Sequence, residues 1–549
     1  MSEPTKFTAA GDATPGPPAP LPTAALATPA GQTIASPSPT PVAPEEAPPA
    51  QAPPATAREA YGARAARGGM VIAATHLVTS AIVFVSQVVM AWLLLPDDFG
   101  TVAVAVSVAA VVGVMRDAGA HWILVGRQEE FDRLAGTVFA LTMSAALICA
   151  LITGVAAPIL AHVKQNPVLL PVMLLTALRF PIGVMGQVST TRLTIDLRWR
   201  ATAIGAFLQP AVTAVAGILM AWRGYGVYSL IVPPILGDAA RGLASWVQAG
   251  ARPLSRPDLG VMRAIIGSSV YIVLVNLAIT TRASADYLTL SFTRGEHETG
   301  LYYYAFNMSQ GFGRLFLGVL PFVVAPVIAK VRHDPQRHAQ AVTRSMHALA
   351  ALATLPMVLQ IVLAWPLFRL ILQAKWAPGA PLFAILSLAI LCLFLNNVVW
   401  SALVASGYYK EYFLYLLAFT PVVLVLFLGG ALLAGATGVA WAVVIVNILD
   451  MILLPLYAFR LLKVPWAPVM SPLWRPLVAA APAALLALAL HHQWPATRAA
   501  DVSRMILIPA AGGVAYLGLL LLLWRETLLD VWGRFAAAIG GAPKQPSAT

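Results

Sequence analysis

The sequence predicts an all-α integral membrane protein with about fourteen transmembrane helices. Of its 549 residues 59% are hydrophobic and only 11% are charged, whereas soluble domains carry about 25% charged residues. Apolar stretches of about 20 residues, long enough as helices to cross the hydrocarbon layer, alternate with short polar breaks from Gly69 almost to the end. The period-two alternation of a membrane β-strand is absent, so these stretches are helices. This composition argues against soluble enzymes, nucleic-acid-binding proteins and secreted disulfide scaffolds.

The N-terminal segment, residues 1–64, differs from everything after it. Residues 1–57 hold 15 of the 43 prolines and a single aromatic residue, Phe7. Such a segment cannot bury a hydrophobic core, so we expect a disordered, solvated tail. It also lacks the apolar core of a secretory signal, so we expect no cleavage.

Beyond this tail, the chain divides into groups of helices. We expect a six-helix lobe at 65–250, a second six-helix lobe at 251–463, two further helices at 464–530 and a short tail at 531–549. The fourteen predicted spans are 70–94, 99–122, 136–158, 168–187, 201–222, 226–248, 266–289, 301–328, 348–370, 381–405, 412–434, 438–459, 472–491 and 504–524.

The distribution of basic residues predicts the orientation of these spans. With the N-terminus in the cytoplasm, 24 Lys and Arg residues lie in cytoplasmic segments and 6 on the opposite side. Basic residues are retained on the cytoplasmic side of membranes, so we expect a multi-pass protein of the inner membrane with both termini in the cytoplasm. Every loop is short, which places any binding or chemistry within the helical body.

An internal duplication is visible in the sequence. Asp98-Phe99-Gly100 before the second span matches Glu298-Thr299-Gly300 before the eighth, at an offset of 200 residues. Gly226 and Asp238 of the sixth span match Gly438 and Asp450 of the twelfth, at an offset of 212. Six helices separate each pair, which predicts two parallel repeats. Proteins built from such repeats bind substrate between the halves.

Basic residues within the spans are the first candidates for a binding site. A charge at mid-membrane depth costs roughly 2.5–3.5 kcal/mol on insertion scales and therefore faces a partner or a wet cavity. Arg179, Arg282 and Arg314 lie in the fourth, seventh and eighth spans. Arg179 and Arg314 have no carboxylate at i±3 or i±4. They either pair with an acid of another helix, such as Asp238 or Asp450, or present a guanidinium suited to phosphate.

Acidic residues within or next to the spans are candidates for gating or ion coupling. These are Asp117, Asp238, Asp286 and Asp450. Helix-to-helix hydrogen bonding is the alternative reading of Asp238 and Asp450. Arg282 and Asp286, spaced i, i+4, can pair directly as a helix-orienting unit or line a cavity.

Two smaller features complete the prediction. Tyr302-Tyr303-Tyr304 at the outer end of the eighth span is most simply an interfacial aromatic belt. Cys149 and Cys392 lie inside apolar runs, so we expect two buried free thiols. Phosphate-cradling loops, metal-binding motifs and paired cysteines are absent, so no cofactor or metal is expected.

Several segments resemble bacterial polysaccharide-transporter flippases, the O-antigen and exopolysaccharide translocases of the multidrug/oligosaccharidyl-lipid/polysaccharide exporter superfamily. They are 95–100 (LPDDFG), 116–119 (RDAG), the basic loop 192–200 and the stretch from Arg282 to Tyr303. The resemblance covers about residues 65–530.

This resemblance implies two lobes around a central cavity and the translocation of polyprenyl-diphosphate-linked oligosaccharide to the outer leaflet, without catalysis. It implies that Arg179, Arg282 and Arg314 hold the diphosphate. The partners would be lipid-linked oligosaccharide, membrane lipids, and a polysaccharide polymerase with its export machinery. Two alternatives remain: a small-molecule exporter of the same superfamily, and a membrane-embedded polysaccharide polymerase or ligase. The short outer loops disfavour the polymerase or ligase.

Overall fold

The computed structural model describes residues 55–117, 124, 128–250, 255–317, 334–493 and 497–540. Within these ranges side chains are not described for 55–70, 73, 117, 264, 266–269, 315–317, 335, 491–493 and 526–540. The described residues are helices joined by short turns, and no strand occurs among them. Most of the expected N-terminal tail, residues 1–54, and the end of the chain, 541–549, lie outside the described residues.

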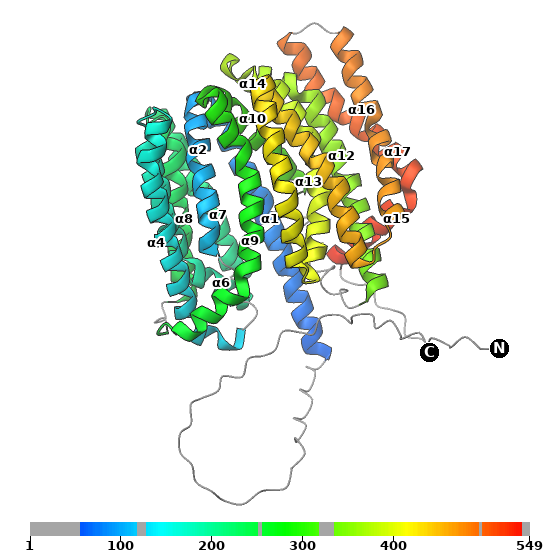
Figure 1. Ribbon diagram of the computed structural model, residues 1–549. Helices are drawn as coiled ribbons and strands as arrows, with labels where there is room; N and C mark the ends of the chain where they lie inside the picture. The colour runs from blue at the N-terminus through cyan, green and yellow to red at the C-terminus, as the bar shows by residue number, and fades with distance from the viewer. Residues whose placement is uncertain are drawn as a thin grey trace, which may run out of the picture. The chain divides into compact units, whose positions relative to one another are not determined.

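Most of the long helices lie side by side along roughly the same axis (Figure 1). The first group comprises α1 (Ala55–Leu93), α2 (Pro96–Gly113), α4 (Phe131–Val163), α5 (Leu169–Met185), α6 (Gln187–Ile195), α7 (Trp199–Trp222) and α8 (Tyr228–Ala249). The second comprises α9 (Leu259–Arg294), α10 (Glu296–Leu317), α12 (Pro335–Ile371), α13 (Gly379–Ala405) and α14 (Tyr409–Leu462). The last are α15 (Trp466–Met470), α16 (Trp474–Gln493) and α17 (Arg498–Gly540). Single 3₁₀ turns lie at Val114–Asp117, Gln128–Glu130, Ala374–Trp376 and Ser471–Leu473.

Each predicted span falls on a helix, wherever the structure describes it. By length and composition, 10 helices in the described part of the chain qualify as membrane spans. One of them, α14, contains two predicted spans, because non-helical backbone at Ala434 and Gly435 divides it. The spans predicted at 226–248, 266–289 and 301–328 correspond to α8, α9 and α10, which are not among the 10. Fourteen crossings therefore stays a prediction.

The ends of the chain are more helical than expected. Helix α1 begins at Ala55, inside the segment expected to be tail, and α17 continues to Gly540, past the boundary expected at 530. Trp524, where the last predicted span ends, has non-helical backbone and divides α17.

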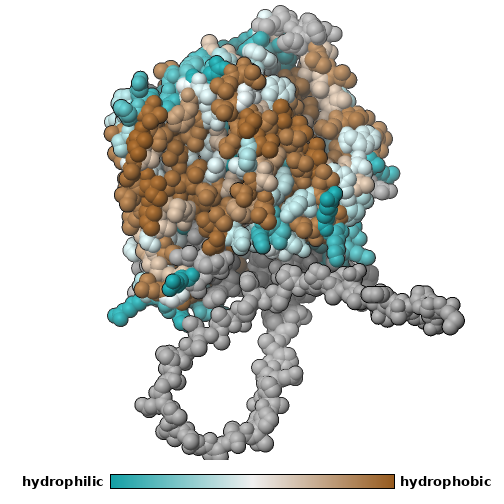
Figure 2. Space-filling view, in the orientation of Figure 1, coloured by the Kyte–Doolittle hydropathy of each residue, from teal (hydrophilic) through white to brown (hydrophobic). Residues whose placement is uncertain are grey.

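The outer surface of the helices is apolar. In the face shown in Figure 2, hydrophobic residues form a broad band, and hydrophilic residues gather above and below it. Large apolar side chains on this surface are strongly exposed, for example Leu433 at 88% and Leu522 at 81%. An apolar surface of this extent requires lipid around it. Cys149 and Cys392 are buried free thiols, which confirms the prediction.

Matched geometry in the two groups of helices supports the predicted duplication. The turns that precede α7 and α14 both contain a left-handed residue, Leu197 with φ 53° and Gly407 with φ 83°. The next amide donates to a carbonyl five residues back in both turns, from Arg198 to Leu193 at 2.9 Å and from Tyr408 to Leu403 at 3.1 Å. Two segments far apart in sequence thus end and restart a helix in the same way.

The two predicted motifs Asp98–Gly100 and Glu298–Gly300 meet each other directly. Helices α2 and α10 pack so closely that a Cβ on Gly100 would collide with the carbonyl oxygen of Glu296. Reciprocally, a Cβ on Gly300 would collide with the carbonyl oxygen of Pro96. Only glycine allows two helix backbones to approach this closely. We call this contact the α2–α10 seam.

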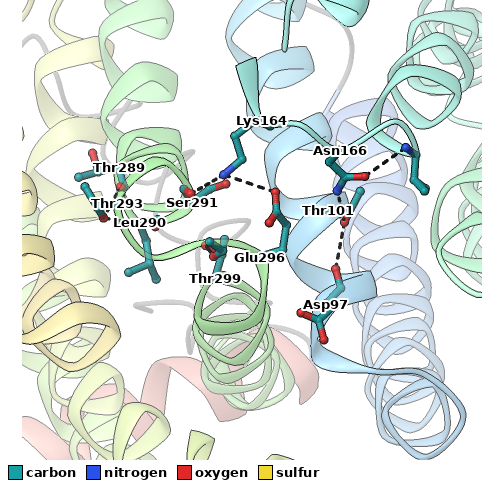
Figure 3. Close-up of polar contacts among 12 residues, drawn as sticks. Asp97, Thr101, Lys164, Asn166, Thr289, Leu290, Ser291, Thr293, Glu296 and Thr299 are labelled. Carbon is teal, nitrogen blue, oxygen red and sulfur yellow. Dashed lines mark hydrogen bonds and ion pairs between the residues drawn. The ribbon is translucent and has the colours of Figure 1, made fainter. Parts of the chain in front are cut away.

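Further contacts join the helix ends around this seam (Figure 3). Lys164, in the turn after α4, reaches across to pair with Glu296 at 3.4 Å, and its ammonium also donates to the carbonyl oxygen of Ser291. The indole N–H of Trp376 donates to the carbonyl oxygen of Ala91 at 2.7 Å. The first and second groups of helices are therefore tied together at this end.

The other end of the bundle, where α2 ends and α4 begins, we call the basic end. Arginines gather there, namely Arg116, Arg133, Arg192, Arg198 and Arg200. The α2–α10 seam lies at the opposite end.

Candidate functional site

Two adjoining cavities lie inside the helical body. The larger has a volume of about 880 Å³ and is lined by residues of α2, α5, α6, α8 and α9. The smaller, of about 480 Å³, lies among α1, α7, α8 and α10. Both are lined by Arg179 of α5, so they meet at its side chain. The larger cavity extends toward the basic end, because its lining includes the last residues of α2 and the turn after it.

Arg179 projects from a helix face that leaves room for the larger cavity. Gly183 and Gly186 follow it at i+4 and i+7, so all three lie on one side of α5 and all three line the cavity. The guanidinium Nε donates to the Asp238 carboxylate at 2.7 Å, while the arginine side chain remains 41% exposed. Arg179 is thus paired across helices, one of the two arrangements expected, and still borders open space.

Asp238 is held by a second donor. The Gln209 amide nitrogen on α7 donates to the other carboxylate oxygen at 2.7 Å, so α5, α7 and α8 converge on one acid. Arg241, one turn further along α8, lines the larger cavity, and its guanidinium donates to the side-chain Oε1 of Gln209 at 3.5 Å. This small network holds the Arg179 side chain between the two cavities.

Arg314 of α10 lines the smaller cavity and is exposed to it. No described carboxylate forms an ion pair with it. Tyr303 and Gln87 line the same cavity, and the side-chain Oε1 of Gln87 is buried without a hydrogen-bond partner in the described structure. A guanidinium without a described acidic partner and an unsatisfied amide oxygen in one cavity lining are an arrangement suited to a polar ligand.

Arg282 lies elsewhere, and the expected pair with Asp286 is not formed. Its guanidinium donates to Asp450 of α14 at 3.0 Å and stacks over the ring of Phe419 at 5.0 Å from the centroid. The Tyr415 hydroxyl donates to the other Asp450 oxygen at 2.6 Å. Arg282 lines neither cavity. Intrahelical spacing could not reveal this, because a partner on another helix offers better geometry than the i+4 neighbour.

Asp286 is fully enclosed and held by neutral donors. It is 3% exposed, accepts a hydrogen bond from the Tyr302 hydroxyl at 2.7 Å and another from the backbone N–H of Tyr287 at 2.8 Å. The expected aromatic belt is therefore wrong. Tyr302 and Tyr304 are buried at 0% and 2% exposure, and Tyr303 lines the smaller cavity.

Asp117 ends the 3₁₀ turn after α2, and its side chain lies outside the described residues. Its neighbour Arg116 lines the larger cavity, and its guanidinium lies beside Gly183. Arg116 and Arg241 are among the 24 basic residues assigned above to the cytoplasmic side, and that assignment did not predict their place in the lining. Their positions within two helical turns of a predicted span boundary were the available signal.

The lining of the two cavities is positively charged. It contains four arginines, Arg116, Arg179, Arg241 and Arg314, and one carboxylate, Asp238. Such a cavity in a low-dielectric body favours an anion, and guanidinium forks match phosphate oxygens. No group of three metal-ligating side chains occurs among the described residues.

Comparison with known proteins identifies the fold. The chain superimposes on the lipid II flippase MurJ in an inward closed conformation, with a TM-score of 0.67, 13% sequence identity, 84% of this chain covered and 100% of that one. An outward-facing multidrug resistance transporter of the MATE family, in the MOP superfamily, gives a TM-score of 0.52 at 13% identity, covering 73% of this chain and 95% of that one. These likenesses establish the fold.

Sequence comparison identifies the family. The succinoglycan biosynthesis transport protein ExoT of Rhizobium meliloti (strain 1021) is 25% identical over 314 residues. That match spans 57% of this chain and 63% of the relative. A profile of polysaccharide biosynthesis proteins matches residues 89–381, more than half of the chain. The chain belongs to the polysaccharide biosynthesis protein family.

Proposed function

We propose that this protein moves polyprenyl-diphosphate-linked oligosaccharide from the cytoplasmic to the outer leaflet of the inner membrane by alternating access. The basic end faces the cytoplasm, as do both termini, and the α2–α10 seam faces outward. No bond is made or broken, so the protein acts as a transporter for exopolysaccharide or lipopolysaccharide synthesis. A polysaccharide polymerase and export machinery would then act on its product.

The observation that carries this proposal is the charge of the two joined cavities. A diphosphate headgroup with its glycan cannot cross hydrocarbon unaided and needs a polar, cation-lined path. Four arginines around one aspartate supply it, in a combined space large enough for sugar residues. The name of the relative, a succinoglycan biosynthesis transport protein, supports the same class of cargo.

In this proposal Arg314 and Arg179 receive the diphosphate. No described carboxylate is paired with Arg314, so none has to be displaced when the diphosphate binds. When the ligand binds, the Arg179 guanidinium leaves the Asp238 carboxylate and pairs with the diphosphate. The Gln209 amide keeps its hydrogen bond to Asp238 during this exchange. Of the candidate acids, Asp117, Asp238 and Asp286 would serve gating or ion coupling, whereas Asp450 holds Arg282 in a structural ion pair. Of these, Asp286 is the strongest candidate for taking up a coupling proton, because its described donors are both neutral.

The alternative of a small-molecule exporter is disfavoured for cationic compounds. A cation would meet four arginines and a single aspartate that is already paired. An anionic small molecule would fit the charge, and the experiment below separates it from a lipid-linked glycan.

Arg314→Ala tests the proposal in a strain whose own gene is deleted and whose polymer and lipid-linked intermediates are measured. We expect polymer export to fall at least tenfold and lipid-linked units to accumulate inside, with Arg314→Lys retaining part of the activity. Arg223→Ala, which removes an exposed arginine beyond the end of α7, is the matched control. Normal export by Arg314→Ala and Arg179→Ala at normal protein levels would rule out the cation-cavity assignment.

A further inference from the structure

A third cavity opens sideways on the first group of helices. It has a volume of about 510 Å³ and lies between α4, α5, α6 and α8, toward the basic end. Its lining is largely apolar, and includes Phe131, Phe139, Met185, Leu243 and Trp246. Met185, Leu243 and Trp246 are 65%, 61% and 51% exposed, so the cavity is open along the surface that faces lipid. We call it the lateral groove.

Helices α6 and α8 separate this groove from the larger, arginine-lined cavity. On α6, Gln187 and Thr190 line the cavity, whereas Val188 lines the groove. On α8, Arg241 lines the cavity and Leu243 the groove. Helix α8 thus presents charged residues to the cavity and apolar residues to the groove. Helix α6 also contributes Ser189 and Arg192 to the groove, where Arg192 is paired with Asp132 at 2.7 Å.

The separation between the two spaces is thin. Gly242 lines both, and Gly186 lies so close that a Cβ on it would collide with the Gly242 backbone. One hydrogen bond, from Thr190 to Ser245 at 3.0 Å, joins α6 and α8 beside the two glycines. Two glycines meet at this point, so a small separation of α6 from α8 would connect the groove with the cavity.

In a lipid-linked glycan, the diphosphate is attached directly to the hydrocarbon chain. The chain must therefore leave the phosphate site through an apolar opening next to it, because the polar cavity cannot solvate it. The lateral groove meets this requirement, since it shares Gly242 with the cavity that holds Arg179 and Arg241. A second apolar cavity, between α12 and α17, shares no lining residue with either arginine-lined cavity.

We propose that the lateral groove binds the first isoprene units of the polyprenyl chain while the diphosphate occupies the larger cavity, and that the Gly186–Gly242 contact is the portal between them. This inference rests on the proposed function and adds a binding site for the lipid part of the substrate. An acyl chain of an ordinary phospholipid has the same chemistry, so the test must distinguish the two.

Photocrosslinking in nanodiscs of phosphatidylethanolamine and phosphatidylglycerol provides this test. The probe is polyprenyl diphosphate with a diazirine in its first isoprene units, and labelled peptides are identified by mass spectrometry. We expect labelling of 182–192 and 239–246, reduced at least fivefold by unlabelled polyprenyl diphosphate and unaffected by added phosphatidylglycerol. Ala239→Trp, which fills the groove from an exposed position, should reduce labelling and transport severalfold. Val247→Trp, also exposed on α8 but outside the groove, should match the unaltered protein.

Two results would overturn the inference and leave the proposed function standing. The first is equal competition by phosphatidylglycerol, which would make the groove an ordinary lipid contact. The second is labelling between α12 and α17 in place of the groove, with normal transport by Ala239→Trp. The proposed function itself fails separately, through normal export by the cavity variants Arg179→Ala and Arg314→Ala.

Discussion

At the scale of single residues, similar arginines have different surroundings. Arg282 and Asp450 are 12% and 16% exposed and satisfy each other, whereas Arg179 is 41% exposed beside a cavity. A buried ion pair orients helices, and breaking it leaves a charge with no partner. Arg314, which lines a cavity without a described acid, is the residue most available to a ligand.

The Arg282–Asp450 pair allows a structural role to be separated from substrate binding. Arg282→Met should destabilise the protein by about 3–5 kcal/mol, because it leaves the Asp450 carboxylate buried without a cation. Arg282→Met with Asp450→Asn should recover most of that loss, since the asparagine oxygen still accepts from Tyr415. Thermal unfolding in detergent measures both, and export measured alongside should remain in the double variant. Loss of export in a stable double variant would instead place Arg282 in the substrate path.

Asp286 offers a second test at this scale. Asp286→Asn keeps an oxygen that accepts from the Tyr302 hydroxyl and removes the negative charge. We expect normal thermal stability and transport reduced at least fivefold, because the charge is the part of Asp286 that gating or coupling would use. Asp286→Ala is the comparison that removes both properties and should also lower stability. Unchanged transport by Asp286→Asn would reduce Asp286 to a helix-joining hydrogen-bond acceptor.

At the scale of helices, apolar length and turn residues predict most of what forms. The spans were predictable because a lipid-crossing helix satisfies its own backbone and its length follows from the bilayer. Which helices touch was not predictable, because an apolar helix can pack in many orientations. The partners Asp450 of Arg282 and Tyr302 of Asp286 lie on other helices, and local periodicity contains no information on them. The same limit explains why Tyr302 and Tyr304 looked interfacial and are buried.

The α2–α10 seam is the element whose role is most directly testable. In Gly100→Ala the new methyl group meets the backbone of Glu296, so the two helices must separate at this end. We expect a shift toward a form open at the outer end, measured as increased reaction of a cysteine introduced at Thr101 with an impermeant maleimide. Gly429→Ala is the control, because a Cβ there has nothing within 4 Å and alanine favours a helix by about 1 kcal/mol. Equal reactivity in all three backgrounds would show that the seam does not separate the two states.

At the scale of the whole molecule, the repeat can be recognised in the sequence, and the structure shows that its matched motifs form one helix–helix contact. The motifs Asp98–Gly100 and Glu298–Gly300 were visible as a pair, and they form the two sides of one seam. Asp238 and Asp450, matched in sequence, each accept from one guanidinium and one neutral donor. The cavities were not visible in this way, because Arg116, Arg241 and Gln209 enter the lining through the packing of helices that are distant in sequence.

The orientation of the chain in the membrane is a prediction, and labelling a cysteine at either end of one helix tests it. Arg200 and Arg223 are exposed at opposite ends of α7, and both native cysteines are buried, so an impermeant maleimide should report only an introduced thiol. With the basic end in the cytoplasm, Arg223→Cys reacts in intact cells and Arg200→Cys reacts only after the inner membrane is permeabilised. The reason is the retention of arginine-rich loops on the cytoplasmic side. The reverse pattern would invert the proposed direction of transport, because the arginine-lined cavity and the lateral groove would then lie toward the outer leaflet.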